Sequence, residues 1–283
     1  MTEEALESLV STQWLAEHLG EPDLVVVDSS WHMPATGRSG RDEYLQAHIP
    51  GARFLDIDAV SDTSNPLPHM LPTAGAFGRA MEDLGVGSGD RIVVYDNSPL
   101  RSAARGWFTL RHFGARNVAI LDGGFQKWVA EGRPTESGEA ERRSARFDSA
   151  ERADEVVTKE QILPGAGCAF IDARGKARFE GTEPEPRAGI ASGHIPGARN
   201  MPYSALYNED GTFRSREQLR ALFEQAGADP GQAFVASCGS GVTAAALVFA
   251  AHLLGHDDGK LYDGSWSEWG ADPQTPKELG PAA

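Results

Sequence analysis

The chain has 283 residues and a formal charge of −15 at pH 7, from 26 Lys and Arg against 41 Asp and Glu. A surface this acidic repels nucleic-acid phosphates and anionic lipids, so we expect neither a nucleic acid nor a membrane as a partner. Two cysteines are too few for a disulfide scaffold or a cysteine-based zinc site.

Short apolar runs alternate with helical stretches along the chain. In order, we expect strands at 24–27 and 92–94, a helix at 103–113, strands at 118–121, 169–172 and 233–235, and a helix at 244–254. A glycine, Gly114 or Gly255, follows each helix in the position that commonly ends one. Strands that alternate with helices are typical of parallel βαβ units, so the predicted fold class is α/β.

Two segments of the first half recur in the second half. His-Ile-Pro-Gly-Ala-Arg stands at 48–53 and again at 194–199, and the Asp-Gly-…-Trp segment at 122–128 resembles that at 263–269. A repeat this long has the size of a small domain, not of a solenoid unit. We therefore predict two tandem domains, 1–135 and 155–283, joined by a charge-rich, solvated linker at 136–154.

The two halves differ at the end of one predicted strand, where Asp96 in the first half corresponds to Cys238 in the second. Gly-Ser-Gly-Val-Thr follows Cys238 and leads into the helix from Ala244. Two glycines let backbone N–H groups turn inward at a helix N-terminus, which stabilises an anion. We therefore expect Cys238 to be an accessible, reactive thiolate instead of a small buried hydrophobe. Cys168, which precedes a buried strand, fits that second description.

These paired segments and the loop from Cys238 to Thr243 resemble the two-domain rhodanese family of sulfurtransferases. The loop resembles that of the family's 3-mercaptopyruvate sulfurtransferase branch. The resemblance implies two rhodanese-like domains, each a small, mostly parallel sheet flanked by helices, of which only the second is catalytic. It also implies that Cys238 carries sulfur as a persulfide, that Asp96 marks the non-catalytic copy, and that neither a metal nor an organic cofactor takes part.

In this interpretation, sulfur passes from 3-mercaptopyruvate to cyanide, a small thiol or a thioredoxin-like protein, and pyruvate is released. The N–H groups of the loop would stabilise the persulfide; its residues are Gly239, Ser240, Gly241, Val242 and Thr243. All five are neutral, whereas thiosulfate sulfurtransferases of this family typically carry basic residues in this loop. A neutral loop suits a monoanionic donor, so a thiosulfate sulfurtransferase is the alternative.

Two arginines, Arg178 and Arg187, flank a proline-rich segment of the second half. A guanidinium presents a planar fork that matches a carboxylate. The residues alone leave open that both arginines simply pair with the neighbouring glutamates, as surface charges usually do; these are Glu180, Glu183 and Glu185. The family resemblance implies that they hold the carboxylate and keto group of the substrate.

The resemblance also implies a relay like that of serine hydrolases, in which Asp58 orients His69 and His69 exchanges a proton with Ser240. His48 and His194 are weaker candidates because each belongs to the segment that occurs in both halves. We expect them to make structural hydrogen bonds instead.

Two other classes of protein compete with this interpretation. A Cys-x5-Arg phosphatase shares a cysteine in an anion-binding loop, but position 244, where its arginine would stand, is Ala244. A non-catalytic binding module is the second, because Asp96 shows that one copy already lacks the cysteine. The acidic N-terminus has no signal-peptide pattern and no apolar run reaches roughly 20 residues, so we expect a cytoplasmic protein, monomeric by default.

Overall fold

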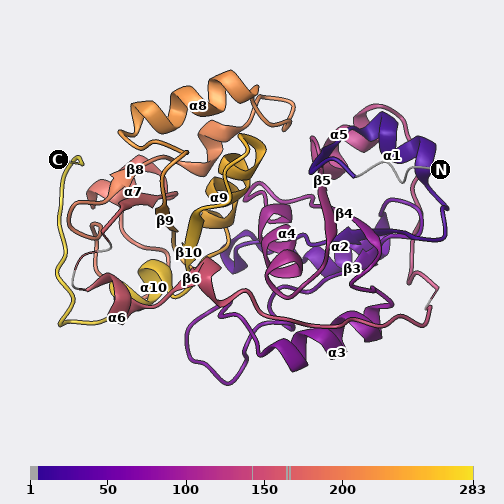
Figure 1. Ribbon diagram of the computed structural model, residues 1–283, viewed down its shortest axis with the longest axis horizontal. Helices are drawn as coiled ribbons and strands as arrows, with labels where there is room; N and C mark the ends of the chain where they lie inside the picture. The colour runs from indigo at the N-terminus through magenta and orange to yellow at the C-terminus, as the bar shows by residue number, and fades with distance from the viewer. Residues whose placement is uncertain (1–5, 142, 164, 166, 283) are drawn as a thin grey trace. The chain divides into compact units, whose positions relative to one another are not determined.

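The computed structural model describes residues 6–141, 143–163, 165 and 167–282, and Figure 1 labels the elements. The chain divides into two compact units. The first comprises Met1–Thr63, Leu71–Arg152 and Glu209–Phe213, and the second comprises Ser64–Met70, Ala153–Asn208 and Arg214–Ala283. Each unit thus includes a short segment from the other half of the sequence. The domain boundaries expected at 135 and 155 stay a prediction.

The first unit contains a five-stranded parallel sheet in the order β1-β5-β4-β2-β3. Its strands are β1 (Leu9–Val10), β2 (Leu24–Asp28), β3 (Arg53–Phe54), β4 (Arg91–Tyr95) and β5 (Asn117–Leu121). Its helices are α1 (Thr12–His18), α2 (Gly40–Gln46), α3 (Ala74–Leu84), α4 (Ala103–His112) and α5 (Gly124–Ala130), with a 3₁₀ helix, η1, at Pro34–Thr36. Val26 of β2 pairs with Val93 of β4, and both side chains are buried, as expected for central strands of a parallel sheet.

The second unit repeats this topology with its own five parallel strands, in the order β6-β10-β9-β7-β8. Its strands are β6 (Val156–Val157), β7 (Ala169–Asp172), β8 (Arg199–Asn200), β9 (Phe234–Ser237) and β10 (Gly259–Tyr262). Its helices are α6 (Lys159–Ile162), α7 (Lys176–Glu180), α8 (Arg216–Gln225), α9 (Ala244–Leu253) and α10 (Ser265–Trp269), with 3₁₀ helices η2 (Ala153–Glu155) and η3 (Tyr203–Leu206). The two sheets have the same permutation, which confirms the predicted pair of α/β folds.

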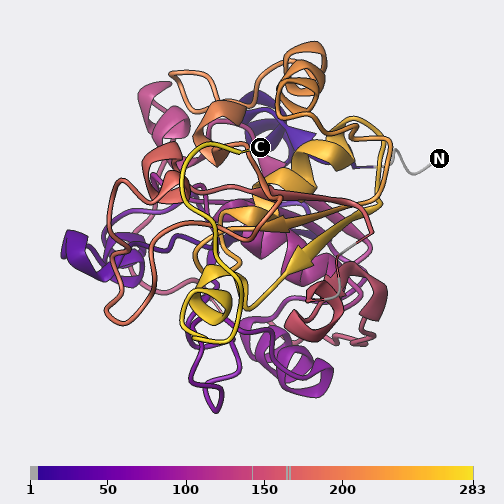
Figure 2. The same ribbon diagram turned by 90° about the vertical axis from the view of Figure 1, so that its left-hand side faces the viewer.

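Helix α9 packs against β9 and β10, and Figures 1 and 2 show it beside these gold strands. Every residue of α9 except His252 is buried, which explains why the sequence here is apolar nearly all round. The helix begins one residue after Thr243 and ends before Gly255, whose φ of +90° is unfavourable for other residues. The sheet and α9 therefore hold the loop 238–243 at both of its ends. No helix among the described residues is long and apolar enough to cross a membrane.

The segment expected to be a linker is exposed at most of its described residues and also packs on the first unit at a few points. Phe147 is buried and meets the ring of Phe77 edge-on at a centroid distance of 5.6 Å. The N–H of Ala150 donates to the carbonyl oxygen of Phe113 at 3.0 Å. One apolar side chain and backbone hydrogen bonds anchor this segment, and neither is visible in its charge-rich composition.

The repeated histidines have the structural role that we expected. Nδ1 of His48 bonds to the carbonyl oxygen of Tyr44 at 2.8 Å, and Nδ1 of His194 bonds to that of Phe179 at 2.9 Å. Each imidazole also stacks on the aromatic ring of the same residue, and both histidines are buried. Hydrogen bonding and stacking within each repeat account for their presence in both copies.

Candidate active site

Cys238 is the first residue after β9, at the carboxyl end of a central strand. Its carbonyl oxygen accepts a hydrogen bond from the N–H of Trp266 at 3.0 Å, just as that of Asp96 accepts one from Phe125 at 3.0 Å. The two residues therefore occupy equivalent positions in the two units. The carboxyl ends of parallel strands are where α/β proteins generally place their sites.

The side chain of Cys238 is more enclosed than we expected, because only 2% of the residue is exposed. Three residues of the loop that follows, Ser240, Val242 and Thr243, are buried as well. This corrects the prediction of an accessible thiol. A site that excludes water also strengthens the interaction between a bound anion and nearby N–H groups.

Ser265, the first residue of α10, is hydrogen-bonded to this loop. Its hydroxyl oxygen accepts the N–H groups of Cys238 and Gly241, both at 3.1 Å, and its O–H donates to the carbonyl oxygen of Tyr262 at 2.8 Å. The N–H of Gly241 is therefore directed at Ser265 and not at the sulfur, contrary to our expectation. Within this loop, all of which the structure describes, the N–H groups of Gly239, Ser240, Val242 and Thr243 have no acceptor.

Both predicted arginines lie close to Gly239, the residue after the cysteine. A Cβ atom placed on Gly239 would lie 3.3 Å from Nη2 of Arg178. Arg187 donates from Nη1 to the hydroxyl oxygen of Ser267 at 3.4 Å, and that hydroxyl donates to the carbonyl oxygen of Gly239 at 2.6 Å. The fold thus brings the arginines and the loop together, although they are far apart in the sequence.

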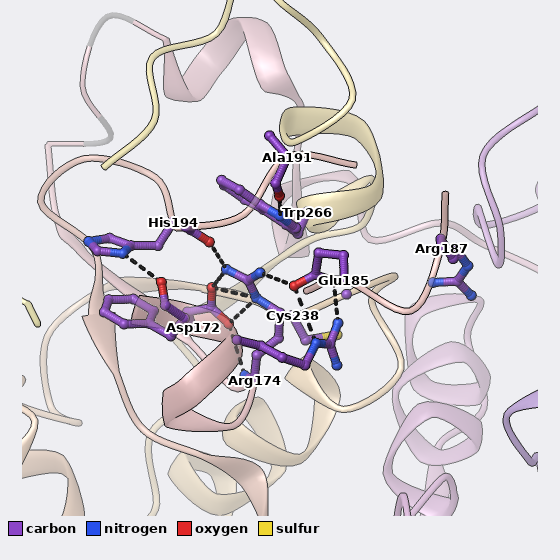
Figure 3. Close-up of polar contacts among 12 residues, drawn as sticks. Asp172, Arg174, Glu185, Arg187, Ala191, His194, Cys238 and Trp266 are labelled. Atoms are coloured by element: carbon purple, nitrogen blue, oxygen red, sulfur yellow. Dashed lines mark hydrogen bonds and ion pairs between the residues drawn. The ribbon is translucent and has the colours of Figure 1, made fainter. Parts of the chain in front are cut away.

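Arg178 forms an ion pair with Glu185, and Glu185 is shared with a second, deeper arginine (Figure 3). This second residue, Arg174, donates from Nη1 to Oε1 of Glu185 at 2.7 Å and from Nη2 to Oδ2 of Asp172 at 2.6 Å. Arg187 lies apart from this cluster in Figure 3. One of the two arginines is therefore paired with a neighbouring glutamate, as the alternative interpretation held. The side chain of that glutamate is buried, however, with 4% of it exposed.

Arg174 is a buried charge that the sequence did not single out. Its side chain is 1% exposed, and its guanidinium lies 4.5 Å from the centre of the Trp266 ring. Burial disfavours the charged form, but the attraction of Asp172 outweighs it, and the pKa of Arg174 lies above its usual value. Arg174 also donates to the carbonyl oxygen of Gly193 at 2.8 Å. Its partners therefore come from β7, from the segment after α7 and from the residue just before the second His-Ile-Pro-Gly-Ala-Arg segment.

His69 belongs to the second unit, where its Nδ1 lies 2.9 Å from the hydroxyl oxygen of Ser240. Its φ of +61° is unusual for a residue other than glycine, and its side chain is buried. Asp58 belongs to the first unit, where its Oδ2 accepts the indole N–H of Trp31 at 2.9 Å. The structure thus joins two of the three relay residues, and the step from Asp58 to His69 stays a prediction.

The described residues contain no group of three or more His, Cys, Asp or Glu side chains placed to share a metal ion. The structure has two parallel sheets of the same strand order, and on one of them a cysteine begins a loop in which most N–H groups have no acceptor. This is the class of fold and site that the resemblance to two-domain rhodaneses implies. The family model for the rhodanese-like domain matches residues 11–131 and again residues 151–272. The chain therefore belongs to the rhodanese family.

Individual relatives within this family indicate the type of reaction that the chain catalyses. The chain is 42% identical to the 3-mercaptopyruvate sulfurtransferase of Mus musculus and 42% identical to the thiosulfate sulfurtransferase of Rattus norvegicus, in each case over 93% of this chain and 91% of the relative. The crystal structure of SseA from Escherichia coli, a 3-mercaptopyruvate sulfurtransferase, matches with a TM-score of 0.84 and 40% identity over 92% of this chain and 99% of that one. These relatives identify the chain as a sulfurtransferase enzyme.

Proposed function

We propose that this enzyme takes the sulfur of 3-mercaptopyruvate onto Cys238 as a persulfide, releases pyruvate, and passes the sulfur to a nucleophilic acceptor. The observation that carries this proposal is the convergence at Gly239, where Arg178 and Arg187 approach the loop of open N–H groups around Cys238. A carboxylate held by the arginines would place the rest of a small donor beside the sulfur of Cys238.

The first half-reaction forms one S–S bond and breaks one C–S bond. The Cys238 thiolate attacks the sulfur of the donor, and the electron pair of the broken C–S bond remains on carbon as the enolate of pyruvate. Ser240 then protonates that carbon, and His69, at 2.9 Å, returns a proton to the hydroxyl. We propose Asp58 as the residue that orients and charges the imidazole.

Once the outer sulfur has released to solvent the thiol proton that it carried in the donor, the persulfide on Cys238 has a negative charge. The N–H groups of Gly239, Ser240, Val242 and Thr243 are free to stabilise it, because none has another acceptor in the described structure. A second nucleophile then attacks the outer sulfur and regenerates the thiolate. We propose cyanide, a small thiol or a thioredoxin-like protein as this acceptor, and the cytoplasm as the compartment.

Thiosulfate is the second candidate donor, because a relative of that name is as similar to the chain as its 3-mercaptopyruvate counterpart. The composition of the loop favours the monoanionic donor. Residues 239–243 carry no cation, and the nearest guanidinium, that of Arg178, is already paired with Glu185. A dianion would lose more hydration than this site restores.

The function is tested by steady-state pyruvate release from 3-mercaptopyruvate with a thiol acceptor. We expect the variant C238S to release pyruvate only at the background rate, because a hydroxyl cannot carry the sulfane sulfur. The matched control is C168S, which changes the other free cysteine and should keep wild-type activity. Pyruvate release that survives in C238S would contradict the proposal.

A further inference from the structure

We propose that Glu185 sets the charge of the donor site and thereby makes the enzyme prefer monoanionic over dianionic sulfur donors. This inference rests on the proposed function, because it concerns the same site. It assigns Glu185 a role as a positioning and specificity-determining residue that acts on the donor through Arg178.

Glu185 is held firmly between two arginines. Its Oε1 accepts from Nη1 of Arg174 at 2.7 Å and from Nε of Arg178 at 3.2 Å, and its Oε2 accepts from Nη2 of Arg178. Only 4% of its side chain is exposed, and Figure 3 shows it bonded to Arg174. A carboxylate at such a depth is stable only with charged partners, so its position is fixed by this pairing.

The four-residue network has no net charge. Arg174 and Arg178 contribute two positive charges, and Asp172 and Glu185 contribute two negative ones. The guanidinium of Arg178, which lies against Gly239, is therefore balanced by Glu185 before any donor arrives. Glu185 occupies Nε and Nη2 of Arg178, so Nη1 remains to donate to a carboxylate. The network offers no surplus of positive charge to a second negative charge.

The number of charges on the donor decides how strongly it responds to this balance. The Coulomb energy between the network and a bound donor scales with the product of their charges. Removing the negative charge of Glu185 would leave the network at +1, and a dianion such as thiosulfate gains twice as much from that change as a monoanion. We therefore expect the preference to shift toward thiosulfate, whatever happens to the overall rate.

The experiment compares kcat/KM for thiosulfate and for 3-mercaptopyruvate in wild type, E185Q and E183Q. Glu183 is an exposed residue two positions away, so E183Q removes the same formal charge outside the network. We expect the thiosulfate-to-mercaptopyruvate ratio to rise about tenfold in E185Q and to stay at the wild-type value in E183Q. An unchanged or lower ratio in E185Q, or an equal rise in E183Q, would overturn the inference.

A second variant keeps the test decisive if E185Q does not fold. D172N removes a negative charge from the same network without touching the contact between Glu185 and Arg178, so it should move the ratio in the same direction. A purely structural role would lower both kcat/KM values equally and leave the ratio constant. If wild type released no pyruvate, the proposed function would fail. If wild type is active and the ratios do not move, only the role of Glu185 is wrong.

Discussion

The two units share one sheet order but fill the loop after the equivalent central strand differently. In the first unit the carboxylate of Asp96 accepts the N–H groups of Ser98 and Ala103, both at 2.8 Å. Burial raises the pKa of Asp96, whereas these N–H groups lower it. In the second unit Cys238 leaves most of the loop N–H groups without an acceptor. In the first loop an internal carboxyl group thus occupies N–H groups, whereas in the second loop the N–H groups remain for a bound anion.

The units also differ at the acid that ends β2 and β7. Asp172 has the buried Arg174 two residues later, whereas Asp28 has Ser30 in the corresponding place, whose N–H donates to it at 2.8 Å. Burial, with a smaller contribution from the nearby Asp96, raises the pKa of Asp28 to about 7. Asp172 therefore has an arginine two residues later as its charged partner, whereas Asp28 has a neutral serine in the corresponding place.

The largest expected effect is a loss of stability when the charged network of the second unit is disrupted. R174M should destabilise the protein by about 3–5 kcal/mol, because it leaves the carboxylates of Asp172 and Glu185 buried without their shared cation. Urea unfolding at several pH values measures this. The loss should be smaller at pH 5 than at pH 8, because protonation relieves a buried, unpaired carboxylate. A loss below 1 kcal/mol at pH 8 would mean that the network contributes little.

The next effect concerns Asp28 in the first unit. Because its pKa is raised in the folded state, the folded protein binds a proton that the unfolded chain releases above pH 4. Stability from this group is complete at low pH and is lost as the pH rises toward about 7. D28N cannot ionise, so it should gain about 1–4 kcal/mol relative to wild type between pH 4 and pH 8. If the unfolding free energies of wild type and D28N depend on pH in the same way, the raised pKa of Asp28 is refuted.

A smaller effect tests the hydrogen bonds between Ser265 and the loop that begins at Cys238. S265A leaves the N–H groups of Cys238 and Gly241 without an acceptor, so we expect kcat/KM to fall about tenfold. Ser265 has a φ of +50°, and its counterpart in the first unit is Gly124 at +58°. S265G should therefore be about 1 kcal/mol more stable than S265A without recovering its activity. Wild-type activity in either variant would show that these two hydrogen bonds are not needed for catalysis.

Much of the fold could be predicted from local patterns. The apolar runs, the glycine after each long helix and the two repeated segments were enough for the paired α/β units, and helices α4 and α9 end within a residue of their predicted limits. The position of Cys238 followed from the comparison of the two halves, because the residues that differ between copies stand out against those that repeat.

The residues around the cysteine were harder to foresee. Arg174 and Glu185 act through contacts between separate loops, and nothing in the charge pattern shows that Glu185 is buried while Glu183 is exposed. The signal for Arg174 was its place two residues after the acid of β7, where the first half has Ser30. Ser265 lay inside a repeated segment, but its left-handed backbone and its two accepted hydrogen bonds depend on the folded loop.

The most direct test of the central claim is the mass of the protein after one turnover without an acceptor. Wild type incubated with 3-mercaptopyruvate should gain the mass of one sulfur atom, located by peptide mapping on Cys238, and should lose it when cyanide or a thiol is added. The variant C238S should gain nothing. A sulfur adduct on Cys168 alone, or pyruvate release from wild type with no adduct at Cys238, would contradict the account.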